Sequence, residues 1–194
     1  MSVAAIIAAA GASRRLGRPK QLVLVDGEPL LQRTIRCAVG AGAEPVFAVL
    51  GGHRQDIQSA IDFGSATVIA NDTWEEGIAS SIRVGVKAVE TEAAACAGVL
   101  LMTCDQPRVT AEHLRKMIEE FDTRKKVVMI ASLYAGTRGI PAIFPRAMFA
   151  NLLGLQGDKG ARGLLAKASL PVVQIPLEGG EVDIDRPEDL AELG

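Results

Sequence analysis

The cations Arg14, Arg15 and Lys20 lie in a short segment that holds Gly11 and Gly17 and directly follows the first apolar run of the chain. Glycines let the backbone approach a ligand and turn its N–H groups toward an anion, while arginine and lysine neutralise phosphate charge. The glycines are six residues apart and no lysine directly follows the second, so neither the dinucleotide fingerprint nor the Walker loop is present. A phosphate-binding loop and a solvated basic turn are both compatible with these residues.

Carboxylates follow apolar runs elsewhere in the chain. Asp105 comes directly after a strongly apolar run and lies two residues before Pro107. Because Mg²⁺ takes one or two protein carboxylates together with phosphate oxygens, Asp105 with either Asp183 or Asp185 would suffice as its ligands. We expect Asp185 to be the second ligand, since strand alternation would place both on one face with Asp183 farther from the sheet edge. A turn-forming role of Asp105 before the proline is the alternative.

Short β-branched runs alternate with segments whose apolar residues recur at helical spacing, which is typical of βαβ units and a mostly parallel sheet. The expected strands are residues 3–9, 45–50, 66–70, 97–103, 126–132 and 171–177, with a further strand at the start of 139–153. The expected helices are residues 29–42, 54–63, 77–89, 110–121, 159–168 and 186–193, with another at the end of 139–153. Thr110 is a candidate N-cap, and His113 is expected to be a solvated helix residue. A single domain spanning residues 1–194 follows.

Composition excludes several classes of protein. Of the 194 residues 48% are hydrophobic, and a net charge of -2 provides no basic field for a nucleic-acid partner. The first apolar run has no positive flank and ends far short of the roughly 20 residues that span a bilayer, so we expect a cytoplasmic protein with no membrane partner. Cys37, Cys96 and Cys104 show no metal-binding spacing and are expected to be buried, Cys104 without a nucleophilic role.

Residues that follow the predicted strands are the next candidates, because ligands of an open parallel sheet lie beyond the carboxyl ends of its strands. Gly51 and Gly52 follow the second of these strands, Asn71 follows the third, and Ser80 and Ser81 lie in the helix after it. We consider these five residues as contacts for a nucleobase and ribose. Ser80 and Ser81 could equally be helix-interior or capping serines.

Taken together, the motifs resemble those of the nucleotidyltransferases that activate the molybdenum cofactor. "AAAGASRRLGRPK" is similar to the family's (L/A)AAGxSxRMGxxK signature, with Leu16 in place of Met, and "CDQP" to its metal-binding Asp-Gln-Pro. "NDTWEEGIASSIRVG", "GDKGARGLL" and "VDIDRPEDL" resemble three further segments of the family, with Arg186 where threonine is usual. The resemblance therefore runs from the first strand to the last helix and implies a three-layer α/β/α Rossmann-like nucleotidyltransferase fold.

The resemblance also implies a reaction and a set of roles. The start Ala9-Ala10-Gly11 resembles the cytidylyltransferase branch, which favours CTP as donor, molybdopterin as acceptor and Mg²⁺ as cofactor. Lys20, Arg15 and Asp105 would be catalytic, and Asp105 with Asp185 would hold the metal. The nucleotide would contact Ala9, Ala10, Gly11, Ala12, Ser13, Gly51, Gly52, Asn71, Ser80 and Ser81, and the acceptor would contact Asp158, Lys159 and Arg162.

One departure concerns the acceptor. Ile140 stands in Gly139-Ile140-Pro141, where such cytidylyltransferases usually carry histidine. A phosphorylated acceptor of another kind, such as a sugar phosphate, or GTP as donor, therefore stays open as an alternative. A non-catalytic nucleotide or cofactor carrier is a further alternative, although such a protein needs no second metal carboxylate. A molybdoenzyme or its chaperone would receive the product.

Overall fold

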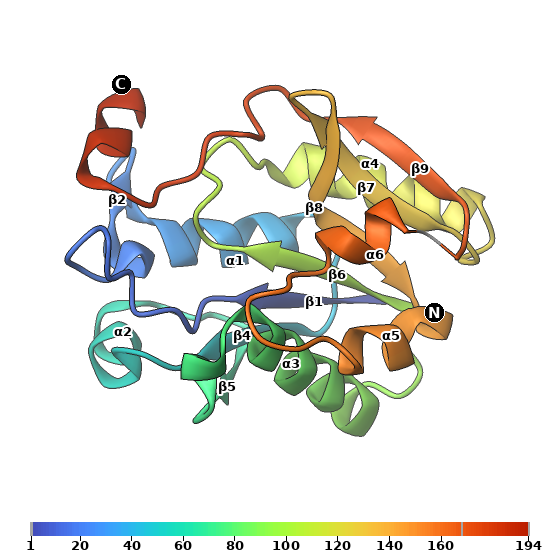
Figure 1. The fold of residues 1–194 in the computed structure, drawn as a ribbon, viewed down its shortest axis with the longest axis horizontal. Coiled ribbons are helices and arrows are strands. Elements are labelled where there is room, and N and C mark those ends of the chain that lie inside the picture. The colour runs from blue at the N-terminus through green and yellow to red at the C-terminus, as the bar shows by residue number, and fades with distance from the viewer. Residues whose placement is uncertain (1, 168, 194) are drawn as a thin grey trace.

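The computed structural model describes residues 2–167 and 169–193 and contains a seven-stranded sheet (Figure 1). Its strands are β1 (Val3–Ala8), β4 (Val46–Leu50), β5 (Thr67–Ala70), β6 (Gly98–Thr103), β7 (Met129–Tyr134), β8 (Thr137–Pro145) and β9 (Val172–Pro176). The strand order is β5-β4-β1-β6-β8-β7-β9, in which β8 runs antiparallel to both of its neighbours and the other pairs are parallel. The expectation of a mostly parallel sheet is confirmed.

Helices cover both faces of this sheet. The first face carries α1 (Leu30–Gly40), α2 (Arg54–Ala60) and α4 (Ala111–Thr123), and the second carries α3 (Ile78–Glu92), α5 (Phe149–Leu153) and α6 (Arg162–Ala166). Each set packs on its own buried apolar cluster, so the three-layer α/β/α fold is confirmed (Figure 1). None of the helices in the described residues combines the length and apolar character that crossing a bilayer requires.

The central strand shows how the sequence builds these layers. Along β1, Val3, Ala5 and Ile7 belong to the cluster of the first face, whereas Ala4 and Ile6 belong to that of the second. Successive side chains of a strand point to opposite faces, so an uninterrupted apolar run is what a strand buried on both faces needs. The strand therefore presents its carboxyl end, and the loop that follows, at one edge of a rigid core.

Some elements differ from the expectations. A two-stranded hairpin, β2 (Leu24–Val25) and β3 (Glu28–Pro29), was not predicted; Asp26 and Gly27 form its turn with φ of 52° and 79°. Positive φ at both turn residues matches the twist of a tight hairpin, and an Asp-Gly pair favours it. The chain ends in a 3₁₀ helix over Pro187–Leu193 where a helix was expected.

The cysteine and capping predictions hold. Cys37, Cys96 and Cys104 are free and buried. Burial, followed by the charge of Asp105, raises the pKa of Cys104 to about 12, so this thiol stays protonated and is not a nucleophile. The Thr110 hydroxyl accepts a hydrogen bond from the backbone N–H of His113 at 3.2 Å and caps α4.

The prediction for His113 was wrong, because its side chain is buried and only 7% of the residue is exposed. Its Nε2 lies 2.8 Å from Ser132 Oγ, and that hydroxyl donates to the Pro141 carbonyl at 2.7 Å. Since the serine proton is used in this second bond, His113 donates from Nε2. Burial, followed by the nearby Lys116 charge, lowers the pKa of His113 to about 4.

This buried imidazole should make stability depend on pH. The unfolded chain takes up a proton near pH 6.5, whereas the folded chain does so only near pH 4, so the free energy of unfolding falls as pH drops below about 6.5. At pH 5 the loss should be about 2 kcal/mol relative to pH 7.5. Urea denaturation at both pH values, with His113→Gln as the matched variant, measures it. An equal loss in both proteins would contradict the assignment to His113.

Candidate active site

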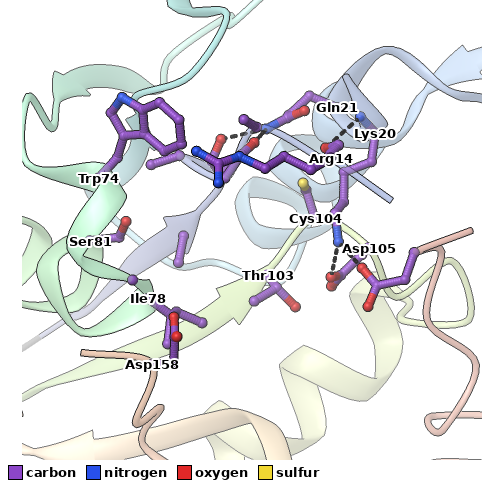
Figure 2. A pocket seen from close by; sticks show the side chains of 18 of the residues that line it. Arg14, Lys20, Gln21, Trp74, Ile78, Ser81, Thr103, Cys104, Asp105 and Asp158 are labelled. Atoms are coloured by element: carbon purple, nitrogen blue, oxygen red, sulfur yellow. Dashed lines mark hydrogen bonds and ion pairs between the residues drawn. The ribbon is translucent and has the colours of Figure 1, made fainter. Parts of the chain in front are cut away.

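A pocket of about 460 Å³ lies at the carboxyl ends of β1 and β6. Figure 2 shows side chains that point into it from the loop after β1, the turn before α3, the end of β6 and the C-terminal segment. The lining residues are Ala8–Arg15, Lys20, Gln21, Trp74, Glu75, Gly77, Ile78, Ser81, Thr103, Cys104, Asp105, Asp158 and Asp185. The fold thus brings together the basic loop and two carboxylates that lie 80 positions apart in the sequence, Asp105 and Asp185.

Hydrogen bonds fix the shape of the loop after β1. Gln21, which is 1% exposed, donates from Nε2 to the carbonyls of Ala9 at 2.7 Å and Gly11 at 3.0 Å. Ser13 has a φ of 52°, its carbonyl accepts from the N–H of Gly17, and its hydroxyl accepts from the N–H of Lys20 at 3.0 Å. These hydrogen bonds hold carbonyl groups of the loop within the protein. N–H groups of the loop that take no part in them can donate to an anion in the pocket.

Lys20 bridges the two carboxylates of the pocket. Its ammonium donates to Asp105 Oδ2 at 2.8 Å and to Asp185 Oδ1 at 2.5 Å (Figure 2). Burial disfavours the charged ammonium, but the charge and hydrogen bond of Asp105 and the hydrogen bond of Asp185 outweigh it and raise the pKa of Lys20. Burial likewise opposes ionisation of Asp185, yet Lys20, followed by Arg15, lowers the pKa of that carboxyl. Lys20 and Asp185 are therefore both charged at neutral pH.

The two arginines of the loop differ in their partners. The Arg15 guanidinium lies 3.1 Å from Asp185 Oδ2, whereas Lys20 contacts the other oxygen of that carboxylate. Two thirds of the Arg15 side chain is exposed. Arg14 forms a 3.6 Å ion pair with Glu75 across the pocket, and both side chains are exposed. Exposed ion pairs contribute little to stability. Both guanidinium groups can therefore move to a phosphate at small cost.

Asp185 is held by the segment around it. Asp189 accepts hydrogen bonds from the backbone N–H groups of Asp185 at 2.8 Å and Arg186 at 2.7 Å. Ile184 is fully buried in a small cluster that includes Leu16 of the basic loop, and its N–H donates to the carbonyl of Asp105 at 2.9 Å. This packing ties the C-terminal segment to both the loop and the end of β6.

Asp183 corrects one detail of the sequence analysis. The segment that holds it is not a strand, so strand alternation does not govern where its side chain lies. Asp183 and Asp185 flank the buried Ile184, and Asp183 lines a second pocket together with Asp105. Burial, followed by the charges of Asp105 and Asp185, raises the pKa of Asp183 to about 7. Negative charge at this edge therefore exceeds what Lys20 balances.

The donor set fits a hard divalent cation. Asp105 and Asp185 offer carboxylate oxygens that already share one cationic partner. Burial, followed by the charges of these two carboxylates, raises the pKa of the neighbouring Asp183. Among the described residues no group of three His, Cys, Asp or Glu side chains is arranged to hold a metal ion. A site of two carboxylates completed by phosphate oxygens is the arrangement that Mg²⁺ commonly uses.

The candidates for base contact fall into two groups. Asn71 and Ser80 are fully buried; Asn71 donates to Ser80 at 2.9 Å and to Ser81 at 3.1 Å, and neither Asn71 nor Ser80 lines the pocket. This network joins β5 to the first turn of α3, so the two residues act as supports of the site, and Ser81 alone of the three lines the pocket.

Gly51 and Gly52 also contribute to the site indirectly, through contacts with residues that line the pocket. Neither lines the pocket, and Gly52 donates its N–H to the carbonyl of Ala10 at 2.9 Å. A Cβ on Gly52 would lie 3.1 Å from Ala12, and one on Gly51 would overlap the Trp74 side chain. Both glycines therefore allow β4 to pack closely against pocket-lining residues.

A second pocket of about 220 Å³ adjoins the first. Ala8, Ile78, Thr103 and Asp105 line both. Of the candidate acceptor residues, Arg162 lines this second pocket, Asp158 lines the first, and Lys159 lines neither.

The walls of the second pocket are partly apolar, with Ile140, Tyr134 and Ile82 among them. Gln106, which is 6% exposed, also lines it, and its Oε1 has no hydrogen-bond partner among the described residues. An unpaired buried amide oxygen is costly unless a ligand or water satisfies it. The oxygen itself has almost no accessible surface, so it does not face the open space of the pocket.

Sequence reasoning missed three residues of the site. Gln21 shapes the loop, Trp74 forms a wall of the pocket, and Asp189 holds Asp185. The only available signals were a polar residue directly after Lys20, the sole tryptophan of the chain, and a carboxylate four residues after Asp185.

Comparisons with known proteins agree with this geometry. The purine catabolism protein PucB of Bacillus subtilis is 26% identical over 95% of this chain and 92% of its own length. A probable molybdenum cofactor guanylyltransferase of Pyrococcus horikoshii is 25% identical over 98% of both chains. The crystal structure of Rv0371c from Mycobacterium tuberculosis superimposes with a TM-score of 0.84 at 31% identity, covering 100% of this chain and 98% of that one, and a complex of the same protein with manganese gives 0.83 at 28%.

The family model described as MobA-like NTP transferase domain matches residues 5–172. This region includes the basic loop and Asp105, together with two glycines that line the pocket: Gly11 in the loop and Gly77 at the start of α3. Of the carboxylates described above, the matched region leaves out Asp183, Asp185 and Asp189. This chain therefore belongs to the MobA-like NTP transferase family and is a nucleotidyltransferase.

Proposed function

We propose that this protein transfers CMP from CTP to the terminal phosphate of a molybdopterin-type acceptor and releases pyrophosphate, as one domain over residues 1–194. The observation that carries this proposal is the position of Lys20 between Asp105 and Asp185, at the end of the loop formed by residues 9–20. Such a site combines N–H groups, cations and paired carboxylates, which is what a triphosphate with a divalent cation requires.

The choice of CTP rests on the resemblance of Ala9-Ala10-Gly11 to the cytidylyltransferase branch. Ala9 and Ala10 both line the pocket with little exposed surface, so their methyl groups help to bound the space for the base. GTP is the second candidate donor, because the similar protein of Pyrococcus horikoshii is named a probable guanylyltransferase.

The second pocket supports a heterocyclic acceptor that carries an acidic group. Its apolar walls suit a flat ring, and Arg162 offers a positive charge. Because Asp105 lines both pockets, an acceptor phosphate reaching from the second would meet the donor in the first. Ile140 takes part as an apolar wall, which is compatible with a ring face and does not replace a histidine donor.

The chemistry is an in-line displacement at the α-phosphorus. An oxygen of the acceptor phosphate forms a bond to the α-phosphorus, and the bond from that phosphorus to the β-phosphate oxygen breaks, so pyrophosphate leaves with the electron pair. Lys20, Arg15 and the loop N–H groups would neutralise the charge that develops on the leaving group. Asp105 and Asp185 would hold Mg²⁺, which supplies Lewis-acid polarisation of the phosphates when it is bound.

The test is pyrophosphate release with CTP, GTP, ATP and UTP, each with Mg²⁺ and with or without molybdopterin cofactor. Release confined to CTP plus cofactor is expected. Release with GTP instead would move the protein to the guanylyltransferase branch. Nucleotide binding without release in the presence of the cofactor would contradict the acceptor and leave a sugar phosphate or another phosphorylated compound to be tested.

Trp74 should report nucleotide binding. It is the only tryptophan of the chain and lies in the pocket wall, across the pocket from Lys20 and Asp105 (Figure 2). We expect CTP to change its intrinsic fluorescence by tens of per cent, since a base placed against an indole alters the ring's environment. Titration of the wild type and of Trp74→Phe, which should show no such signal, checks this. An unchanged spectrum at saturating CTP would place the base elsewhere.

A further inference from the structure

The ammonium of Lys20 occupies the place between the two carboxylates that we assign to the metal. It contacts Asp105 Oδ2 and Asp185 Oδ1, and its side chain is only 15% exposed. The second oxygen of Asp185 is taken by Arg15 at 3.1 Å. Cations of the phosphate loop therefore pair with Asp105 Oδ2 and with both oxygens of Asp185.

An ammonium and a divalent cation cannot share this position. Mg²⁺ and Mn²⁺ need carboxylate oxygens at about 2.1 Å and lose hydration water only reluctantly. An ion between Asp105 and Asp185 would lie within a few ångströms of the Lys20 nitrogen, where like charges in a partly buried site repel strongly. A free ion must therefore displace Lys20 before it can bind.

The Lys20 ammonium gains other anionic partners only when a triphosphate is bound in the pocket. Its backbone N–H is bonded to Ser13 Oγ and its neighbour Gln21 is anchored to Ala9 and Gly11, so the loop itself is held while the flexible side chain can swing. The pocket that the side chain faces is lined by the loop that would bind the triphosphate. A triphosphate offers the ammonium new anionic partners, and the carboxylates become free at the same moment.

We propose that the Lys20 ammonium blocks the Asp105–Asp185 carboxylate pair against free divalent ions, so that the metal binds only together with the nucleotide. This rests on the proposed use of a divalent cation by Asp105 and Asp185. It implies an ordered binding scheme in which the loop cation and the metal exchange positions: the ammonium moves to the triphosphate as the ion moves to the carboxylates.

The test measures binding of Mn²⁺ alone to the full chain by the electron paramagnetic resonance signal of the free ion. Wild type should bind Mn²⁺ weakly, and Lys20→Met should bind it at least about tenfold more tightly, since the repelling charge is gone. Lys87→Met, a change of an exposed lysine on α3 that lines neither pocket, should match the wild type. A Lys20→Met/Asp105→Asn double variant should lose the gain, because one of the two ligands is removed. Lys20→Gln serves if the methionine variant does not fold.

Two results would overturn the proposal: tight Mn²⁺ binding by the nucleotide-free wild type, or no gain in either Lys20 variant. Adding the nonhydrolysable analogue in which methylene joins the α- and β-phosphates of CTP should raise Mn²⁺ affinity in the wild type. Suppose that Lys20→Met binds Mn²⁺ more tightly but the wild type releases no pyrophosphate from any nucleotide. That result would support the blocking role of Lys20 and contradict the proposed transferase reaction. Pyrophosphate release by the wild type, without tighter Mn²⁺ binding in the Lys20 variants, would support the transferase reaction and contradict the blocking role of Lys20.

Discussion

Replacing Asp105 with asparagine is expected to lower the rate of pyrophosphate release by about three orders of magnitude, since one charged group acting on the transferred phosphoryl is commonly worth that much. Asp105 lines both pockets and is one of the two partners of Lys20. Asparagine keeps the size of the side chain but removes the charge that would hold a cation beside the α-phosphate. The fold should survive, because the side chain is not part of either main apolar cluster.

Steady-state kinetics with saturating CTP and cofactor measures this loss, and a thermal melt shows that the variant is folded. The matched control is Asp72→Asn, a carboxylate whose ion pair with Arg54 is exposed and which lines neither pocket. That control should keep its rate within about twofold, as expected for an exposed pair. A folded Asp105→Asn that keeps more than a tenth of the wild-type rate would remove Asp105 from the reaction.

Gly77→Ala is expected to be the most damaging single-methyl change near the site. Gly77 caps the start of α3 with φ of 113° and ψ of -177°, a conformation that is essentially confined to glycine. An added Cβ would also lie 2.6 Å from the carbonyl oxygen of Gly157 and would overlap the Asp158 carboxylate. Strain and backbone overlap together should cost about 3 kcal/mol of unfolding free energy.

The same change should impair nucleotide binding, because Gly77, Ile78 and Asp158 all line the first pocket. Urea denaturation gives the stability loss, and Trp74 fluorescence gives the affinity for CTP. Gly163→Ala is the matched control: Gly163 lies in α6, and nothing lies within 4 Å of a Cβ built there. It should be neutral or slightly stabilising. If both alanine variants unfolded at the same urea concentration, the close approach at Gly77 would carry no energetic weight.

The elements that sequence predicted best are those whose signal is local. The apolar run of β1 and the helical stripe of α1, with Leu31 and Ile35 buried, specify their own type and length. The carboxyl ends of β1 and β6 lie together because the strands pair in parallel, so the meeting of the basic loop with Asp105 followed from topology alone.

What the sequence could not predict depends on partners far along the chain. His113 flanks the apolar stripe of α4, and only Ser132 on β7, 19 residues later, makes its burial possible. Asn71 follows a strand just as a ligand contact would, yet α3 covers it. The direction of β8 is equally invisible in its residues. This antiparallel strand is buried on both faces in its second half, so its apolar run reads like that of a buried parallel strand.

The bond between Lys20 and Asp185 joins residues 165 positions apart. During synthesis the strands β1, β4, β5 and β6 have all been made once residue 103 is added, but Asp185 is added more than 80 residues later. A nascent chain can thus assemble half of its sheet, and present its basic loop, long before the second carboxylate exists. Catalytic competence would then arrive only after Asp185 has been added, and until that point the loop cations would lack this anionic partner.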